Sequence, residues 1–244
     1  MPRATNRIYS KLRKKGFRPR HVAEVGVYLP EACNVYDYIT DDVRCTLVEP
    51  EVSSVEAIEK HFRDRSNVTL HPVAVHARVG DLELVRRAAS TFAADVTAAP
   101  AIVNDAYRVR DEDRVVVPAT TFDRIDDGTI DLLSVDIEGS EWYVLKHMVS
   151  TPGVISLETH GALYTNPHLA EILRWMEERD YCVWYKDRTD TVFVRRGEFR
   201  VDLWERIALL FVDIRIALRR FRKRLVRKTS MQPGHAGTGR GDRN

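Results

Sequence analysis

The sequence predicts an α/β fold in which a mostly parallel sheet carries helices on both faces. Short apolar runs alternate along the chain with segments whose apolar residues recur every three or four positions. The run at residues 130–137 is apolar enough to indicate a central strand that is buried on both faces. Because strands that alternate with helices form parallel sheets through crossover connections, we expect one such domain over residues 21–200.

The expected elements follow one another in order. Strands are predicted at residues 21–27, 44–48, 67–75, 82–86, 114–117, 130–137, 154–158, 181–186 and 191–195. Helices are predicted at residues 52–64, 121–125, 140–149 and 169–179. Gly80-Asp81 separates the strand at 82–86 from the strand at 67–75, which predicts a hairpin between them. Residues 88–113 lack periodicity, and we expect a long loop or lid there.

The two ends of the chain differ from its middle in charge. Residues 1–20 contain eight Lys or Arg and no acid, which predicts a basic N-terminal arm with a short helix. Residues 203–244 contain eleven Lys or Arg and three acids; within this part, 201–228 is predicted to be a basic amphipathic helix and 229–244 a disordered tail. Since the whole chain carries only +2, its middle is acidic. This argues against a nucleic-acid-binding core and leaves the ends to meet something anionic.

The cysteines and the hydropathy pattern indicate a cytoplasmic protein. Cys33, Cys45 and Cys182 are scattered without a Cys-x-x-Cys pair, which is typical of packed thiols in a reducing compartment and not of a disulfide frame or a zinc site. No signal-peptide pattern is visible, and no run approaches the roughly 20 apolar residues that cross a bilayer.

Acidic residues stand at the ends of three predicted strands, where doubly wound sheets bind their ligands. The first end reads Glu24-Val25-Gly26-Val27-Tyr28. Gly26 has no Cβ and would let the backbone approach a bound nucleoside, and Glu24 could accept hydrogen bonds from an ammonium group. The alternative for this segment is an ordinary strand-to-helix turn.

The second strand end is Glu49-Pro50. Glu49 follows Gly26 by 23 residues, close to the spacing at which an acid binds both ribose hydroxyls of a nucleotide. A solvated glutamate is the alternative, but the agreement with the first segment favours the ribose role.

The third strand end carries Asp136, which closes the most apolar strand of the chain. An acid at the end of a buried strand is costly unless it has a purpose, so Asp136 is a candidate functional residue. Glu138 and Glu141 follow at the start of a helix, where exposed backbone amides favour carboxylates. Stabilisation of the helix start is the alternative for these two, and for Glu141 it is the favoured one.

Four segments resemble the FkbM family of methyltransferases. They are Glu49-Pro50, Pro72–Val75, Thr120–Asp123 and above all Ile130–Glu141, which is similar to the most specific signature of the family. The resemblance covers roughly residues 22–195 in matching order. The sequence departs from the family at Glu24–Pro30, which keeps only an acid and the first glycine of the usual glycine motif.

The resemblance implies a Rossmann-like class I methyltransferase, with seven strands of which the last is antiparallel. It implies S-adenosyl-L-methionine as cofactor. Its expected binding residues are Glu24, Gly26, Val27, Tyr28, Glu49, Pro50, Val73, Ala74 and Asp136. Known relatives chiefly methylate hydroxyls, so the expected acceptor is a hydroxyl of a saccharide or of another glycosylated or secondary metabolite.

Methyl transfer to a hydroxyl requires an aligned acceptor and a group that takes its proton. Asp136 is the first candidate, and His160 and Glu158, near the end of the strand at 154–158, are further candidates. His160 could instead cap a loop. Asp136 with Glu158 or His160 could hold Mg²⁺, but nothing in their spacing demands a metal, and none is predicted.

Two other functions and two roles of the tail stay open. A degenerate methyltransferase-like scaffold would explain the altered glycine motif, whereas the absence of Gly-x-Gly-x-x-Gly after the first strand disfavours a nicotinamide-dependent oxidoreductase. Residues 203–228 could lie on the inner membrane surface as a peripheral contact, or pack on the domain or on a second subunit of a homo-oligomer. The expected partner is a small-molecule or glycan acceptor, with no nucleic acid.

Overall fold

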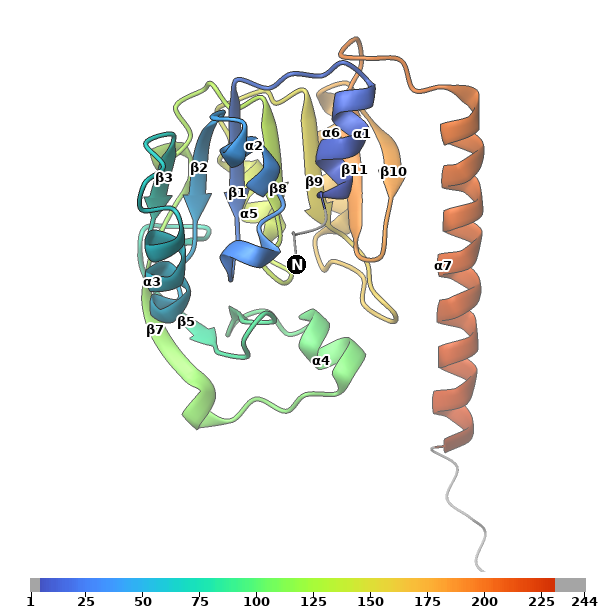
Figure 1. The fold of residues 1–244 in the computed structure, drawn as a ribbon. Helices are drawn as coiled ribbons and strands as arrows, with labels where there is room; N and C mark the ends of the chain where they lie inside the picture. Colours follow the sequence, from blue (N-terminus) through green and yellow to red (C-terminus); the bar gives the residue numbers. More distant parts are fainter. Residues whose placement is uncertain (1–4, 231–244) are drawn as a thin grey trace, which may run out of the picture.

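The computed structural model describes residues 5–230, and its centre is a seven-stranded sheet (Figure 1). The strand order is β10-β11-β9-β8-β1-β2-β3. The bounds are β1 His21–Val25, β2 Arg44–Val48, β3 Val68–His71, β8 Leu132–Val135, β9 Val154–Glu158, β10 Tyr181–Lys186 and β11 Asp190–Arg195. The strands from β9 to β3 are parallel, and β11 lies antiparallel between β9 and β10. The predicted mostly parallel sheet with an antiparallel last strand is confirmed.

Successive residues of the central strands serve opposite faces of this sheet. Val22, Leu132 and Val154 are in register and belong to one hydrophobic cluster. The next residue of each strand belongs to a second cluster, on the other face. Both clusters are closed to solvent, which explains why these strands read as continuous apolar runs.

Helices cover both faces. Those of the first cluster are α1 (Arg7–Lys14), α2 (Tyr36–Thr40) and α3 (Val52–His61). Those of the second are α5 (Glu141–Lys146) and α6 (Leu169–Glu178), with the 3₁₀ turn η3 (Phe122–Arg124) beside them. The expected N-terminal arm contains α1, and its Ile8 and Leu12 are buried in the first cluster. This segment therefore contributes to the domain core although it is strongly basic.

A second, four-stranded sheet lies beyond the carboxyl ends of the central strands (Figure 1). Its strands are β4 (Ala74–Val75), β5 (Gly80–Val85), β6 (Phe92–Ala93) and β7 (Arg114–Thr120), in the order β4-β7-β5-β6. The predicted hairpin of 82–86 with 67–75 is wrong, because β5 pairs with β7 and β6. The predicted strand 67–75 is interrupted around Pro72, which has no amide hydrogen to donate.

The segment predicted as a long loop at 88–113 contains regular structure. It holds β6, the helix α4 (Pro100–Asp105) and the 3₁₀ turn η2 (Asp111–Asp113). Phe92, Val96, Ala99 and Ala101 are buried against β5 and β7 in a third cluster. The long-loop prediction is therefore wrong: this segment packs as a small lobe, whose apolar residues, many of them alanines, follow no regular period in the sequence.

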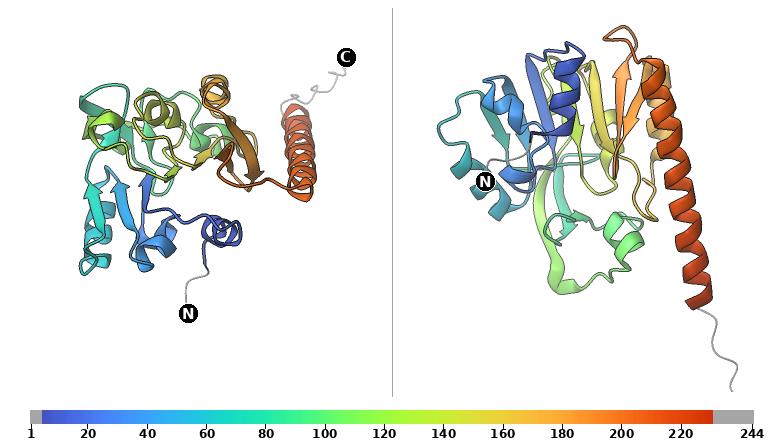
Figure 2. Two further views of the ribbon diagram at one scale, coloured as in Figure 1. Left: turned by 90° about the horizontal axis from the view of Figure 1, so that it is seen from above. Right: turned by 45° about the vertical axis from the view of Figure 1, so that its right-hand side comes forward.

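The last element is α7 (Leu203–Ser230), which confirms the predicted helix. It runs along the edge strand β10 and extends past the carboxyl end of the sheet (Figures 1 and 2). Three polar contacts attach it: Lys186 Nζ to Asp213 at 2.6 Å, Trp184 Nε1 to Glu205 at 2.8 Å and Lys15 Nζ to Glu205 at 2.6 Å. No helix within 5–230 has both the length and the apolar content to cross a membrane. Of the expected tail 229–244, residues 231–244 lie outside the described part of the chain.

Candidate functional site

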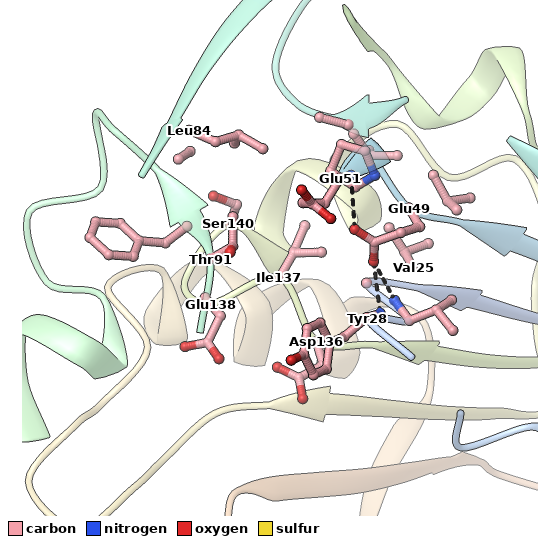
Figure 3. Close-up of a pocket in the computed structure, with 18 of the residues that line it drawn as sticks. Val25, Tyr28, Glu49, Glu51, Leu84, Thr91, Asp136, Ile137, Glu138 and Ser140 are labelled. Carbon is pink, nitrogen blue, oxygen red and sulfur yellow. Dashed lines mark hydrogen bonds between the residues drawn. The ribbon is translucent and has the colours of Figure 1, made fainter. Parts of the chain in front are cut away.

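A cleft opens between the carboxyl ends of the central strands and the small second sheet (Figure 3). It encloses about 950 Å³ of empty space, its open mouth included. It lies where β1 separates β2 from β8, the point at which the strand order reverses. All nine residues expected to bind the cofactor line it: Glu24, Gly26, Val27, Tyr28, Glu49, Pro50, Val73, Ala74 and Asp136.

Gly26 is held by the backbone of the neighbouring strand end. Its φ is +87°, and a Cβ atom there would lie 1.9 Å from the carbonyl oxygen of Asp136. The Gly26 amide donates to Val48 O at 2.9 Å, and the Asp136 amide donates to Val25 O at 3.0 Å. Glycine is therefore required by the packing of β1 against the segment after β8, a reason that the sequence does not reveal.

Glu49 joins the end of β2 to the loop after β1. Its Oε2 accepts from the amides of Val27 at 3.1 Å and Tyr28 at 2.8 Å, and its Oε1 accepts from Glu51 N at 3.0 Å (Figure 3). Burial raises its pKa, and these amides oppose that rise. A carboxylate offers about four acceptor positions, so Glu49 can still take a hydroxyl from the cleft.

Glu24 is buried and holds the turn that follows the 3₁₀ helix η1 (Pro30–Ala32). Its Oε1 accepts from Asn34 N at 3.0 Å, and its Oε2 accepts from Val35 N and Cys33 Sγ, both at 3.1 Å. Asn34 also lines the cleft. Glu24 thus shapes this wall, and its contact with an ammonium group stays a prediction.

Three carboxylates meet at one end of the cleft: Asp136, Glu138 and Glu158, hereafter the carboxylate cluster. Val135 of β8 pairs with Leu157 of β9, and Asp136 and Glu158 are the next residues along these two neighbouring strands. Glu138 stands in a tight turn with φ +56°. One oxygen from each of the three lies within 4.8 Å of the others. Asp136 and Glu138 line the cleft, and Glu158 lies behind them.

The cluster is unfavourable for negative charge. Burial is the largest cause, and repulsion from neighbouring carboxylates adds to it. Together they raise the pKa of Asp136 to about 7, that of Glu138 to about 9 and that of Glu158 to about 11. Protons or a cation must therefore accompany these groups when they are brought together.

Glu141 is buried beside the cluster but is satisfied by the chain. Its Oε1 accepts from the amides of Ile137 at 3.0 Å and Gly139 at 3.1 Å, and Asn166 Nδ2 donates to its Oε2. Glu141 is the first residue of α5, so its predicted role at the helix start is confirmed.

His160 faces a different hollow, lined also by Lys186 and Asp213 near α7. Its Nδ1 lies 3.0 Å from Thr159 Oγ1, and its backbone amide donates to Thr189 O at 3.1 Å. The structure thus brings Asp136 and Glu158 together and places His160 apart from the cleft. The geometry supports the loop alternative for His160 and gives no support to its predicted role as a base.

A family model described as the methyltransferase FkbM domain matches residues 22–183. The chain belongs to the FkbM methyltransferase family. The matched residues begin at the second residue of β1 and contain all strands from β2 to β9, the cleft and the carboxylate cluster, whereas α1 and α7 lie outside them.

Solved structures similar to this FkbM chain are distant. The methyltransferase domain of bacterial CtHen1 is 9% identical, with a TM-score of 0.43, covering 77% of this chain and 94% of that one. Aeropyrum pernix fibrillarin, solved with S-adenosyl-L-methionine, is 11% identical with a TM-score of 0.40, covering 76% and 73%. A predicted O-methyltransferase from Agrobacterium tumefaciens, Atu636, is 11% identical with a TM-score of 0.37, covering 72% and 73%. No curated protein matches the chain.

The FkbM cleft also contains residues that the sequence did not reveal. Leu84, Thr91 and Phe92 close it from the second sheet, and His76 lines it after β4. The His76 ring lies 4.3 Å from the Tyr143 ring, and burial lowers its pKa. The one sequence feature that could have indicated this wall is Phe92, a single aromatic residue among small residues.

Proposed function

We propose that this FkbM methyltransferase uses S-adenosyl-L-methionine to methylate a hydroxyl of a saccharide or of another glycosylated or secondary metabolite. The observation that carries the proposal is the convergence of Gly26, Glu49 and Asp136 around one cleft at the switch point of the sheet. Strand ends at this position are where α/β sheets bind nucleoside-containing ligands.

The residues of the cleft suit such a cofactor. Glu49 retains acceptor positions for ribose hydroxyls, and Val48 and Val73 offer an apolar wall for the adenine ring. Asn34 and the backbone near Gly26 would receive the amino-acid end. When bound, the cofactor supplies a methyl group on a positively charged sulfur.

The chain's own residues then act on the acceptor. Asp136 has a buried oxygen, Oδ1, with no hydrogen-bond partner among residues 5–230, and it is placed to orient an acceptor hydroxyl. Polar groups of Glu51, Thr91 and Ser140 line the cleft and could receive the other hydroxyls of a sugar. Leu84 and Phe92 shield the cleft from water, which favours alignment of the two reactants.

Calorimetric titration with S-adenosylhomocysteine, followed by a methyl-transfer assay on a panel of glycosides and aglycones, tests the proposal. We expect micromolar binding of S-adenosylhomocysteine and a product in which an oxygen carries the added methyl. Absence of binding by folded protein would favour the scaffold alternative. Methylation of a nitrogen or a carbon would refute the O-methylation part alone.

A further inference from the structure

The buried acids of this molecule fall into two groups. Glu24, Glu49, Asp126 and Glu141 each accept two or more hydrogen bonds from backbone amides. In the carboxylate cluster, Asp136 Oδ1, Glu138 Oε2 and Glu158 Oε2 are buried and find no hydrogen-bond partner among residues 5–230. The first group is stabilised by backbone amides, whereas each member of the second keeps an unpartnered buried oxygen, although the Glu138 side chain also has a hydrogen bond with Ser90.

The three carboxylates lie close together. Glu138 and Glu158 are only 8% and 5% exposed, and one carboxylate oxygen from each of the three residues lies within 4.8 Å of the other two. No ion pair formed by the described residues involves any of them. Because buried polar atoms without partners are costly, such an arrangement calls either for protons on the carboxylates or for a cationic ligand.

The spacing suits a small divalent cation. Oxygen ligands on opposite sides of Mg²⁺ lie about 4.2 Å apart, and around Ca²⁺ they lie about 4.8 Å apart. The three carboxylates come from separate places, the end of β8, the turn after it and the end of β9. They can thus approach an ion from different directions after small side-chain rotations.

We propose that Asp136, Glu138 and Glu158 bind a divalent cation of the Mg²⁺ or Mn²⁺ class at the inner end of the cleft. Three carboxylates leave coordination positions for water or for an acceptor, since Asp136 and Glu138 reach the cleft. Adjacent hydroxyls of a saccharide are suitable ligands for these positions.

The role of this cation in turnover rests on the proposed function, whereas its binding does not. A divalent cation lowers the pKa of a hydroxyl that it contacts. The acceptor oxygen then forms its bond to the methyl carbon while the methyl–sulfur bond breaks. The electron pair of that bond remains on sulfur, giving neutral S-adenosylhomocysteine, and the hydroxyl proton passes to water.

Titration of the full-length protein with Mn²⁺, followed by the loss of the free-ion electron paramagnetic resonance signal, tests the site. We expect one saturable site, and in Glu158→Gln a roughly tenfold or greater loss of affinity. Glu59→Gln, an exposed acid on α3, is the matched control and should bind as the wild type does. Circular dichroism melting checks that both variants fold.

Two outcomes overturn the metal site: no Mn²⁺ binding by folded wild type, or equal affinity in wild type and Glu158→Gln. Titration with S-adenosylhomocysteine on the same samples separates the proposals. If the folded protein binds S-adenosylhomocysteine but does not bind Mn²⁺, only the cation site is refuted. If it binds Mn²⁺ but does not bind S-adenosylhomocysteine, only the proposed function is refuted.

A second inference concerns α7, which has two apolar faces. On one face Val212 and Ile216 are half-buried, Ile216 lines a hollow together with Val183 of β10, and Asp213 forms an ion pair with Lys186. The opposite face, hereafter the outer face, is open to solvent. Its residues are Leu203, Leu210, Phe211, Ile214, Leu218 and Phe221, between 46% and 69% exposed.

Basic residues border the outer face. Arg206 lies along one side of it, and Arg215, Arg219 and Arg222 lie along the other, all exposed. Trp204, 77% exposed, lies at its margin. An apolar face of aromatic and aliphatic residues bordered by arginines is typical of helices that lie in the surface of an anionic membrane. A second copy of the same helix on this face would instead bring arginines close to arginines.

We infer that the outer face binds an anionic lipid surface. Flotation with vesicles of phosphatidylglycerol and phosphatidylcholine tests this, with pure phosphatidylcholine vesicles as the charge control. We expect co-flotation only with the anionic vesicles, and its loss in Phe211→Glu/Leu218→Glu. Val52→Glu, at a position 68% exposed on α3, is the matched control and should still float. The inference is refuted if the double variant floats as the wild type does. It is also refuted if the wild type binds no lipid but forms a dimer that the double variant does not form.

Discussion

The carbonyl oxygen of Asp136 lies 1.9 Å from the position that a Cβ atom of residue 26 would occupy. The backbone of the loop after β1 and the backbone that carries the carboxylate cluster are thus in direct contact. A displacement of one is therefore expected to disturb the other, so the proposed cofactor side and the proposed acceptor side of the cleft meet at one close backbone contact.

Replacement of Gly26 by alanine is expected to destabilise the protein by about 2–4 kcal/mol, because it combines a positive φ with a backbone clash. Urea denaturation measures this loss. Gly16→Ala is the control: Gly16 has φ +78° but no atom near its missing Cβ, so about 1 kcal/mol is expected there. Equal losses in the two variants would show that the contact with Asp136 is not tight.

Glu49 is predicted to act mainly in cofactor binding, and Asp136 mainly in turnover. Glu49→Ala should weaken binding of S-adenosylhomocysteine by roughly tenfold or more, because a charged acceptor for the ribose is lost. Asp136→Asn should lower kcat by about a hundredfold and leave nucleoside affinity nearly unchanged. Calorimetry and steady-state kinetics on both variants check the division. Similar losses of affinity in both would contradict it.

Glu24→Gln is expected to cost about 1–3 kcal/mol of folding free energy, since both carboxylate oxygens accept hydrogen bonds from residues 33–35. The amide NH₂ of glutamine would face an N–H or S–H donor. Chemical denaturation measures the effect, and Glu59→Gln on the surface of α3 should be neutral. A stable Glu24→Gln variant would mean that this turn is held by other contacts.

His21 should make the protein less stable in mild acid. Its buried ring lies 2.8 Å from Thr129 Oγ1 and 2.9 Å from Thr46 Oγ1, and burial is the main cause that lowers its pKa. The unfolded chain therefore takes up a proton first as the pH falls below about 6.5, and stability decreases until the folded state is also protonated. Urea midpoints at about pH 7.5 and about pH 5 should differ less in His21→Gln than in wild type. If the difference between the two urea midpoints is the same in His21→Gln as in wild type, other groups cause the acid sensitivity.

The parallel part of the fold could be predicted because its strands are buried on both sides. The predicted limits of 44–48 and 154–158 coincide with β2 and β9. The pairing of β5 with β7 could not be predicted, because a pairing across about thirty residues leaves no local pattern. For the same reason, the adjacent Gly80-Asp81 turn suggested the wrong partner.

The candidate site was predictable where a side chain directly follows a strand. Glu49, Asp136 and Glu158 were found in this way, since parallel strands end at one edge. His160 lies only two residues beyond Glu158, but hydrogen bonds to Thr189 turn its backbone away from the cleft. The approach of Glu138 to Asp136 depends on a left-handed residue in the turn, which no periodicity reveals.

The course of α7 determines how the molecule would rest on a bilayer. Since the helix runs alongside the edge strand β10 (Figures 1 and 2), a molecule anchored by its outer face would stand edge-on, with its strands parallel to the lipid plane and its sheet perpendicular to it. The mouth of the cleft, at the carboxyl ends of the strands, would then open sideways along the membrane. A lipid-tethered sugar could enter by lateral diffusion within the leaflet, without leaving its membrane.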